Sequence, residues 1–206
     1  MPVFCENYEK LVSNLEDRGF TVHSAANGAE AKEIALSLIG GGSVGCGGSM
    51  TVNGLGIPAA LREKGNAVYL HWDEKPEDRP ETFKKAAAAD WYLCSTNAIT
   101  MNAKLINIDG NGNRVAAMFA GPRKVMLVIG KNKLAKDLES GMERVKTVAC
   151  VKNAQRFGLQ TPCAVTGKCA DCHDPRRICA VTTIIEKKPG LLDELHLILV
   201  DEELGY

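Results

Sequence analysis

The chain has 206 residues and is 45% hydrophobic and 24% charged, an ordinary composition for a globular protein that buries a full core. Its 25 basic and 25 acidic residues give a formal net charge of zero, which argues against a general binder of nucleic acid or other polyanions. No apolar run has the length of a membrane span, and the amino-terminal residues lack the apolar segment of a signal peptide. We therefore expect a cytoplasmic protein with a single domain over residues 1–206.

Helical and strand patterns alternate through the first half of the chain. Asn27 is a plausible N-cap for the second helix, with Glu30 completing a variant of the capping box. The polar segment 73–82 contains two prolines and is too short for a confident domain linker. The predicted helices are 5–18, 28–39, 49–55, 58–63 and 81–89, and the predicted strands are 21–25, 67–72 and 91–94.

The alternation continues in the second half. The sequence DGNGN, after a strand pattern, is a strong signal for a hairpin or a loop. Together the patterns predict an α/β domain with a largely parallel sheet, and in such sheets ligands bind at the carboxyl ends of strands. We expect Val68–Leu70, Val125–Ile129 and Leu197–Val200 to be buried strands of that sheet. The predicted strands here are 104–108, 124–129, 180–185 and 195–200, and the predicted helices cover 134–148 and the residues up to 157.

A glycine-rich turn, with the sequence VGCGGSMT from residue 44 to 51, stands where a strand should be followed by a helix. Consecutive glycines let backbone N–H groups converge on a ligand, and a helix N-terminus favours anions. The pattern is neither G-x-G-x-x-G nor a P-loop, so it predicts neither a dinucleotide nor a nucleoside triphosphate. The alternative is a tight turn chosen for packing. The expected ligand-binding residues are Gly45, Gly47, Gly48, Ser49 and Thr51.

Polar side chains also follow two other predicted strands. Asn97 and Thr100 come after the strand at 91–94, and Asn132 and Lys133 come after the strand at 124–129. These four residues could bind a small anionic molecule in the same cleft. The histidines at 23, 71 and 196 lie singly in or beside apolar strands, where a structural role is commoner than a catalytic one. No nucleophile–base pair stands out, so the residues themselves do not predict a reaction.

Four of the eight cysteines fall within the segment TPCAVTGKCADCHDPRRIC, with the spacing C-x5-C-x2-C-x6-C. Thiols stay reduced in the cytoplasm, so metal ligation suits them better than disulfide bonds. Structural zinc usually shows two short C-x2–4-C pairs, and only one is present here. A [4Fe–4S] cluster suits the wider spacing, which looks like the compact cluster loop of endonuclease III-type DNA glycosylases. Zinc, free thiols and disulfides remain alternatives. The expected ligands are Cys163, Cys169, Cys172 and Cys179, and small core positions are expected for Cys5, Cys46, Cys94 and Cys150.

Five segments together, VGCGGSMT, STNAIT, INIDGNGNRVAAM, KVMLVIGKNK and the cysteine segment, resemble the lactate-utilisation (LUD) family, the LutC/YkgG-like group. The resemblance runs from about residue 7 to residue 206. It implies a Rossmann-like sheet of the NagB/RpiA/CoA-transferase-like fold. The cysteine-rich segment itself is expected to form a loop at 161–180, inserted near the C-terminus of that domain. It also implies a redox or accessory subunit that takes part in oxidising L-lactate, or a related small hydroxy acid, to the keto acid alongside iron–sulfur partner proteins.

The chain departs from this family in two respects. It lacks the ferredoxin-like domain of the larger members, and the four-cysteine segment is not universal among them. A different substrate is therefore open. The alternative function is a small anionic-ligand-binding or transferase-like protein with a structural zinc site, and fold analogy does not decide between the two.

Overall fold

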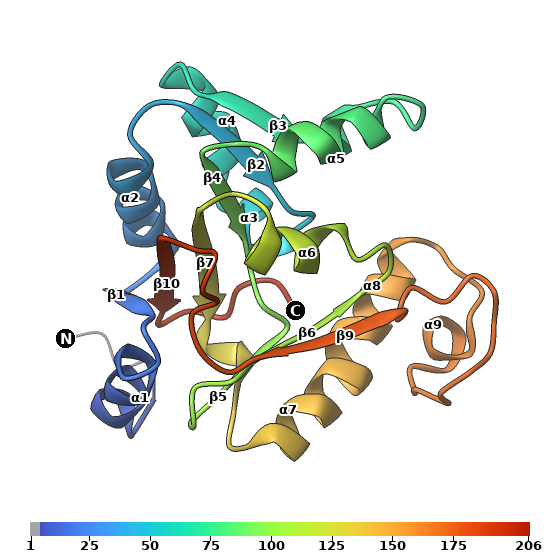
Figure 1. Cartoon of the computed structure of the whole chain (residues 1–206). Coiled ribbons are helices and arrows are strands. Elements are labelled where there is room, and N and C mark those ends of the chain that lie inside the picture. The colour runs from blue at the N-terminus through green and yellow to red at the C-terminus, as the bar shows by residue number, and fades with distance from the viewer. Residues whose placement is uncertain (1–4) are drawn as a thin grey trace.

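The computed structural model describes residues 5–206 and is built on a six-stranded, all-parallel sheet (Figure 1). The strand order is β1-β10-β7-β4-β2-β3, so β7 and β10 lie inside the sheet and the strands β1 and β3 form its edges. The strands are β1 (Thr21–Ala25), β2 (Ser43–Cys46), β3 (Ala67–Leu70), β4 (Trp91–Cys94), β7 (Lys124–Gly130) and β10 (Glu194–Val200).

Helices cover both faces of this sheet, which explains why its central strands read as continuous apolar runs. One face packs against α2 (Gly28–Ile39), α3 (Met50–Gly54) and α4 (Ile57–Glu63) in one hydrophobic cluster. The other face packs against α1 (Tyr8–Glu16), α5 (Arg79–Ala87) and α6 (Asn113–Ala120) in a second cluster. This second cluster also contains residues of a smaller sheet.

The smaller sheet has four strands in the order β8-β5-β6-β9, and all but the β5–β8 pair are antiparallel. Its buried residues Ile99, Leu105 and Ile185 belong to the same cluster as residues of β7 and β10. A third, small cluster joins it to the helical segment from α7 to α8. These elements are β5 (Ala98–Thr100), β6 (Leu105–Asp109), β8 (Leu134–Ala135), β9 (Val181–Ile185), α7 (Leu138–Arg144), a π-helical turn η3 (Val145–Ala149) and α8 (Cys150–Arg156).

Several sequence expectations are confirmed. The Asn27 side chain accepts the Glu30 N–H at 3.0 Å, as an N-cap should. The carboxylate of Glu30 accepts the N–H of Ala26 at 2.7 Å, one residue before the N-cap, which is why the capping box is a variant. The α/β class and the mainly parallel sheet are present, and the three apolar runs expected in one sheet are its strands β3, β7 and β10.

Other expectations were wrong. Of the two alternatives predicted for DGNGN, the hairpin is wrong and the loop is present: Asp109 accepts the N–H groups of Asn111 and Gly112, and the left-handed Gly112 opens α6, a helix that no pattern predicted. Val68 in β3 is only half-buried, because β3 is an edge strand. The helix expected from residue 134 begins at Leu138, since Leu134 pairs with Ile99 in the smaller sheet. The segment expected as a loop at 161–180 contains a helical turn, α9 (Pro162–Thr166).

Candidate functional site

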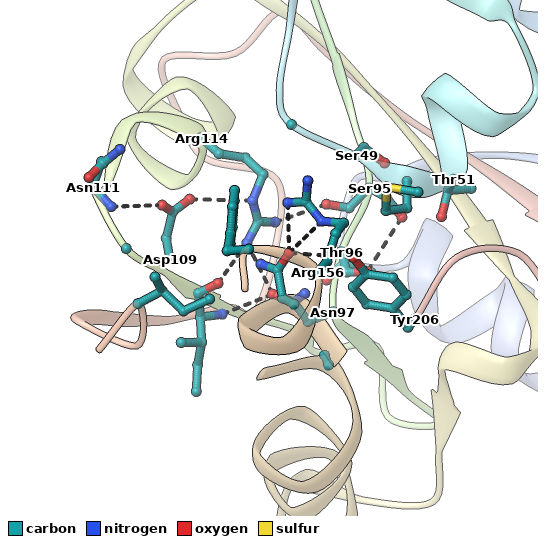
Figure 2. A pocket seen from close by; sticks show the side chains of 18 of the residues that line it. Ser49, Thr51, Ser95, Thr96, Asn97, Asp109, Asn111, Arg114, Arg156 and Tyr206 are labelled. Carbon is teal, nitrogen blue, oxygen red and sulfur yellow. Dashed lines mark hydrogen bonds and ion pairs between the residues drawn. The ribbon is translucent and has the colours of Figure 1, made fainter. Parts of the chain in front are cut away.

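A pocket of about 190 Å³ opens at the carboxyl ends of the main strands (Figure 2). Residues that follow β2, β3, β4 and β7 line it, which is the position where parallel sheets bind ligands. The wall opposite the sheet comes from α8, from the turn after β6 and from Ile178. The polar lining residues include Ser49, Thr51, His71, Ser95, Thr96, Asn97, Asp109, Asn111, Asn113, Arg114, Lys133, Asn153, Arg156 and Tyr206.

Lys133 is a cation at the inner wall of this pocket. Its side chain is 2% exposed, and its ammonium group donates to Thr51 Oγ1 and to Ser95 Oγ, each at 2.8 Å. Burial, followed by the nearby Arg144 and Arg114, lowers the pKa of Lys133 to about 7. Within residues 5–206 its hydrogen-bond partners are these two hydroxyls and no carboxylate. A buried cation without an acidic partner lacks a compensating negative charge, and an anionic ligand would supply it.

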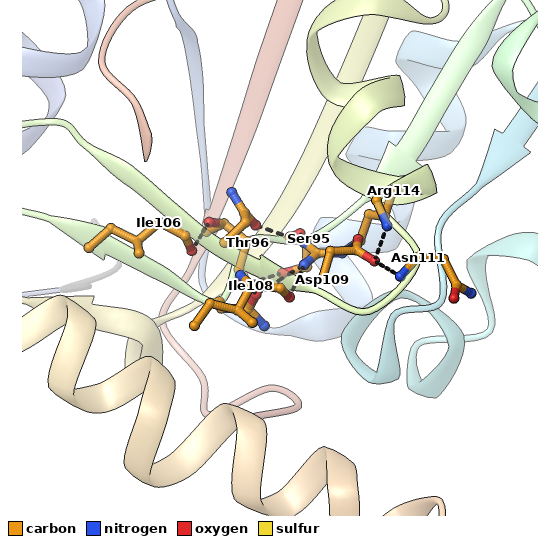
Figure 3. A network of polar contacts seen from close by, with 10 residues as sticks. Ser95, Thr96, Ile106, Ile108, Asp109, Asn111 and Arg114 are labelled. Carbon is orange, nitrogen blue, oxygen red and sulfur yellow. Dashed lines mark hydrogen bonds and ion pairs between the residues drawn. The ribbon is translucent and has the colours of Figure 1, made fainter. Parts of the chain in front are cut away.

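Arg114 is the centre of a polar network that joins β6 to the loop after β4 (Figure 3). Its guanidinium donates to the backbone carbonyls of Ser95 and Ile108 at 3.0 and 2.9 Å, and to the Oδ1 atoms of Asn107 and Asn97 at 2.7 and 3.0 Å. Its Nε also lies 3.3 Å from Asp109 Oδ2. Because all these groups are nearly buried, the network positions the pocket wall rather than leaving Arg114 free to move.

The outer part of the pocket is aromatic and cationic. Arg156 lies over the rings of Trp72 and Phe157, at 5.0 and 4.0 Å from their centroids, and donates to Asn153 Oδ1. Tyr206, near the pocket in Figure 2, donates to the same Asn153 oxygen at 3.5 Å. Among the described lining residues, three side chains are basic and one, Asp109, is acidic. The field inside the pocket therefore favours an anion.

Five of the residues expected to bind a ligand line this pocket, namely Gly48, Ser49, Thr51, Asn97 and Lys133. Ser49 is also the N-cap of α3 and accepts the Val52 N–H at 3.3 Å. Asn97 points its Oδ1 to the N–H of Ile108 and to Arg114, so it orders the wall. The structure brings these residues together from three separate loops, as the sheet topology predicted.

Four expected residues lie outside the lining. Side-chain carbons at Gly45 and Gly47 would lie 2.2 Å from Ala86 O and 2.9 Å from Cys94 Cβ, so these glycines serve close packing. Thr100 is fully buried, donates to Asn102 Oδ1 and accepts the Lys104 N–H.

Asn132, the fourth, holds the carboxyl-terminal tail. It donates to Gly205 O and accepts the Leu204 N–H. These partners occupy its amide group in a structural contact. They also bring the tail, and with it Tyr206, towards the pocket.

The sequence interpretation missed Arg114, Arg156, Asp109 and Tyr206. The signal for Arg114 was its place directly after the DGNGN turn, but that turn was interpreted as a hairpin or a loop, with no helix after it. The contact between two of the histidines was not foreseen either. His23 and His196 on the neighbouring strands β1 and β10 contact each other at 2.9 Å, and His196 lies 2.8 Å from Glu194.

The cysteine segment borders the pocket wall. Cys163 lies in α9, and the other three expected ligands lie in the irregular stretch from 167 to 180 that leads into β9. Arg177 donates from Nε to Cys179 Sγ at 3.2 Å and from Nη1 to the carbonyl of Cys172. Ile178, next to Cys179, lines the pocket. All eight cysteines are unpaired in this structure.

The fit of a metal centre to these four cysteines is mixed. The donors suit it, because thiolates hold both iron–sulfur clusters and structural zinc. Their arrangement does not suit a metal centre, because within residues 5–206 no three Cys, His, Asp or Glu side chains are grouped closely enough to hold an ion. Cys169 is exposed and the other three are half-buried, so closing them around one centre would require the segment to move.

The fold and the pocket define an α/β protein with a mainly parallel sheet and a pocket at its carboxyl edge whose lining includes Arg114, Lys133 and Arg156. The family model described as the LUD domain matches residues 8–200, and the chain belongs to the LUD domain family, which relates it to lactate utilisation. No curated protein matches the chain. The crystal structure of a DUF162 family protein from Deinococcus radiodurans aligns with a TM-score of 0.56 at 14% identity, over 97% of this chain and 99% of that chain. At this identity the likeness concerns the fold alone.

Membrane insertion by a helix finds no support in the structure. None of the helices within residues 5–206 combines the length and the apolar character that crossing a bilayer requires.

Proposed function

We propose that the pocket binds a small organic acid of the lactate–pyruvate type and that the protein takes part in its oxidation. The observation that carries the proposal is Lys133, a buried cation whose described partners are the hydroxyls of Thr51 and Ser95. A carboxylate placed beside it would supply the missing negative charge. Membership in the LUD family supports lactate, or a related hydroxy acid, as the compound to test first.

The lysine also suits the chemistry of such a substrate. Oxidising a hydroxy acid to its keto acid removes two electrons and two protons. With a pKa of about 7, Lys133 is present in both protonation states near neutral pH, so it can accept a proton from a bound hydroxyl group. The fixed charge of Arg114, 12% exposed and held by its network, would still favour the carboxylate when Lys133 is neutral.

The redox part of the proposal assigns a [4Fe–4S] cluster, or zinc in a purely structural role, to the cysteine segment. A cluster carries one electron at a time, so it would pass the two electrons of the oxidation one after the other to a partner protein that serves as the oxidant. Support comes from the four thiols and from their place next to Ile178 in the pocket wall. Iron–sulfur proteins would then be the electron-transfer partners. A NagB/RpiA/CoA-transferase-like fold is part of the same proposal and is supported by the mainly parallel sheet with a pocket at its glycine-rich turn.

Calorimetric titration with L-lactate, pyruvate and acetate tests the binding step. The Lys133→Met variant should bind L-lactate at least about tenfold more weakly, because a hydrogen bond to a charged group contributes about 1.5–3 kcal/mol. The matched control is Lys131→Met, two residues away, whose exposed ammonium pairs with Asp201 at 3.0 Å and should leave binding unchanged. The proposal is wrong if the wild type binds none of these acids, or if Lys133→Met binds them as tightly.

A further inference from the structure

Two cavities adjoin at the carboxyl end of the main sheet: the inner pocket, which contains Lys133, and an outer cavity of about 480 Å³. Five residues line both of them, so the two spaces are continuous. The shared residues are His71, Trp72, Asn111, Arg156 and Phe157. A molecule bound beside Lys133 can therefore extend into the outer cavity. Lactate, whose side chain is a single methyl group, has nothing to place there.

The size of the outer cavity suits a larger ligand. Pockets that bind drug-sized molecules measure about 300–1,000 Å³. The outer cavity falls within this range, whereas the inner pocket, at about 190 Å³, lies below it. Phe157, which lines both spaces, is 51% exposed. A large apolar ring that is exposed within a cavity is a surface that a ligand can cover.

One wall of the outer cavity is built by α5 and the segment before it. Arg79, Pro80 and Phe83 lie on one face of α5, since residues three and four positions apart are neighbours on a helix. Pro76 adds to this wall from the preceding segment. Each proline has a fixed φ, so the wall has a defined shape before a ligand binds. The polar segment 73–82, to which the sequence assigned no role, is thus part of a cavity.

The lining of the outer cavity is aromatic and basic. Its large rings belong to Trp72, Phe83 and Phe157. Its cations are Arg79 and Arg156, and within residues 5–206 none of its lining residues is acidic. Arg156 already lies over the rings of Trp72 and Phe157, as guanidinium groups commonly do. A further ring in this cavity would find both aromatic neighbours and cations that attract its face.

The two spaces differ in the part of a ligand that they suit. Around Lys133 the inner wall presents the hydroxyls of Thr51 and Ser95, which suit a carboxylate or a hydroxyl group. An aromatic ring is disfavoured there, because it would bury these polar groups without offering them hydrogen bonds. The outer cavity offers apolar rings instead. A second carboxylate near its arginines would leave those rings uncovered.

We propose that the substrate is a 2-hydroxy acid with an aromatic side chain, of which L-3-phenyllactate is the simplest example. Its carboxylate lies beside Lys133, and its ring lies in the outer cavity beside Phe83 and Phe157. This inference rests on the proposed function and narrows its substrate class. The ring lies away from the reacting carbon, so the oxidation itself is the one described for lactate.

Calorimetric titration with a series of acids tests this inference. L-3-Phenyllactate should bind the wild type at least about tenfold more tightly than L-lactate, because the ring removes a large apolar surface from water. Its binding should also have the more negative heat-capacity change, which marks apolar burial. L-2-Hydroxyglutarate carries a second carboxylate in place of the ring and should bind more weakly than L-3-phenyllactate. An affinity for L-3-phenyllactate no higher than that for either of the other acids would overturn the inference.

Variants locate the ring. Phe83→Ala should lower the ratio of the L-3-phenyllactate affinity to the L-lactate affinity at least about threefold, because Phe83 lines the outer cavity and not the inner pocket. Phe157→Ala, at its exposed position, should lower L-3-phenyllactate binding as well and serves if Phe83→Ala loses the wild-type circular dichroism. The matched control is Phe119→Ala in α6, a half-buried phenylalanine that lines neither space and should leave the ratio unchanged. Wild-type affinity for L-3-phenyllactate in both cavity variants would contradict the inference.

The same titrations separate this inference from the proposed function. Lys133→Met should weaken the binding of both L-lactate and L-3-phenyllactate. If it weakens L-lactate alone, the aromatic acid binds away from Lys133 and the inference is wrong. If the wild type binds L-lactate more tightly than L-3-phenyllactate, the aromatic substrate class is wrong while the acid site remains. If the wild type binds neither acid, the proposed function and the inference both fail.

Discussion

Lys133 lowers the stability of the free protein and at the same time provides a cation for the pocket. Its ammonium group is buried, and Arg144 and Arg114 act on it from nearby. Burial disfavours the charged form, so the pKa of the lysine falls to about 7 from its ordinary value of 10.5. Two hydroxyls do not offset the lost hydration of a full charge. The free energy that this residue costs in the free protein can be recovered when an anion binds.

This burial predicts a specific dependence of stability on pH. Between about pH 7 and pH 10.5 the unfolded chain binds a proton at Lys133 that the folded chain does not, so the lysine's destabilising effect is complete below pH 7 and fades as the pH rises. Lys133→Met removes this contribution. Its free energy of unfolding in urea, relative to wild type, should be most favourable near pH 7 and decline towards pH 10. A difference that stays constant over this range would contradict the lowered pKa.

A steric prediction concerns Gly48. A side-chain carbon at this position would lie 3.1 Å from the indole ring of Trp72, which lines the pocket. Gly48→Val should therefore displace Trp72 into the pocket and weaken L-lactate binding in calorimetry, while circular dichroism shows the fold retained. Gly54→Ala is the matched control, because nothing lies within 4 Å of the added carbon. Unchanged affinity in Gly48→Val would mean that the ligand binds elsewhere.

The position of a residue in the pocket was predictable from the sequence where the order of the strands alone determines that position. Lys133 and Ser49 follow strands whose carboxyl ends share one edge of the sheet, so their meeting could be foreseen. Asn132 follows β7 and Thr100 is the last residue of β5, but their polar groups are used in contacts with Gly205 and Asn102. Which side of a loop a residue faces depends on such tertiary partners, and no local pattern encodes them.

At the scale of elements, the segment from β6 to α6 differs most from what the sequence patterns predicted. The DGNGN turn has the composition of a hairpin, yet it turns the chain into a helix whose second residue is Arg114. The guanidinium then joins β6 to the loop after β4. The π-helical turn η3 was equally hidden, because its residues fit the apolar stripe of an ordinary helix.

The Arg114 network predicts a large effect on stability. Arg114→Met leaves Asp109, Asn97 and Asn107 without their buried partner, and removing one member of a buried pair costs about 3–5 kcal/mol. Urea denaturation should show this loss. Arg123→Met, which breaks the exposed pair with Asp193, should change stability little because solvent screens that pair. Similar midpoints for the two variants would show that the network adds nothing to the fold.

At the scale of the whole molecule, the question is whether the two sheets form one cooperative unit. The parallel sheet was predictable from alternating patterns. Of the smaller sheet only β6 and β9 were predicted, because β5 has three residues and β8 has two, too few for a periodic signal. The two sheets nevertheless share a core. Leu105 of the smaller sheet is fully buried in the same cluster as Leu127 and Leu197 of the main sheet.

This shared core predicts that damage to the smaller sheet destabilises the main sheet as well. Leu105→Ala should cost about 2–5 kcal/mol through lost burial and a residual cavity. Both tryptophans belong to the main-sheet region, Trp91 in β4 and Trp72 just after β3, so their fluorescence reports that region. Fluorescence and far-ultraviolet circular dichroism should therefore shift to the same lower denaturation midpoint. Ile184→Ala, at a 41% exposed position of β9, should shift neither by much. A fluorescence midpoint that stays at the wild-type value in Leu105→Ala would show that the sheets unfold separately, and the expectation of one domain over residues 1–206 would be wrong.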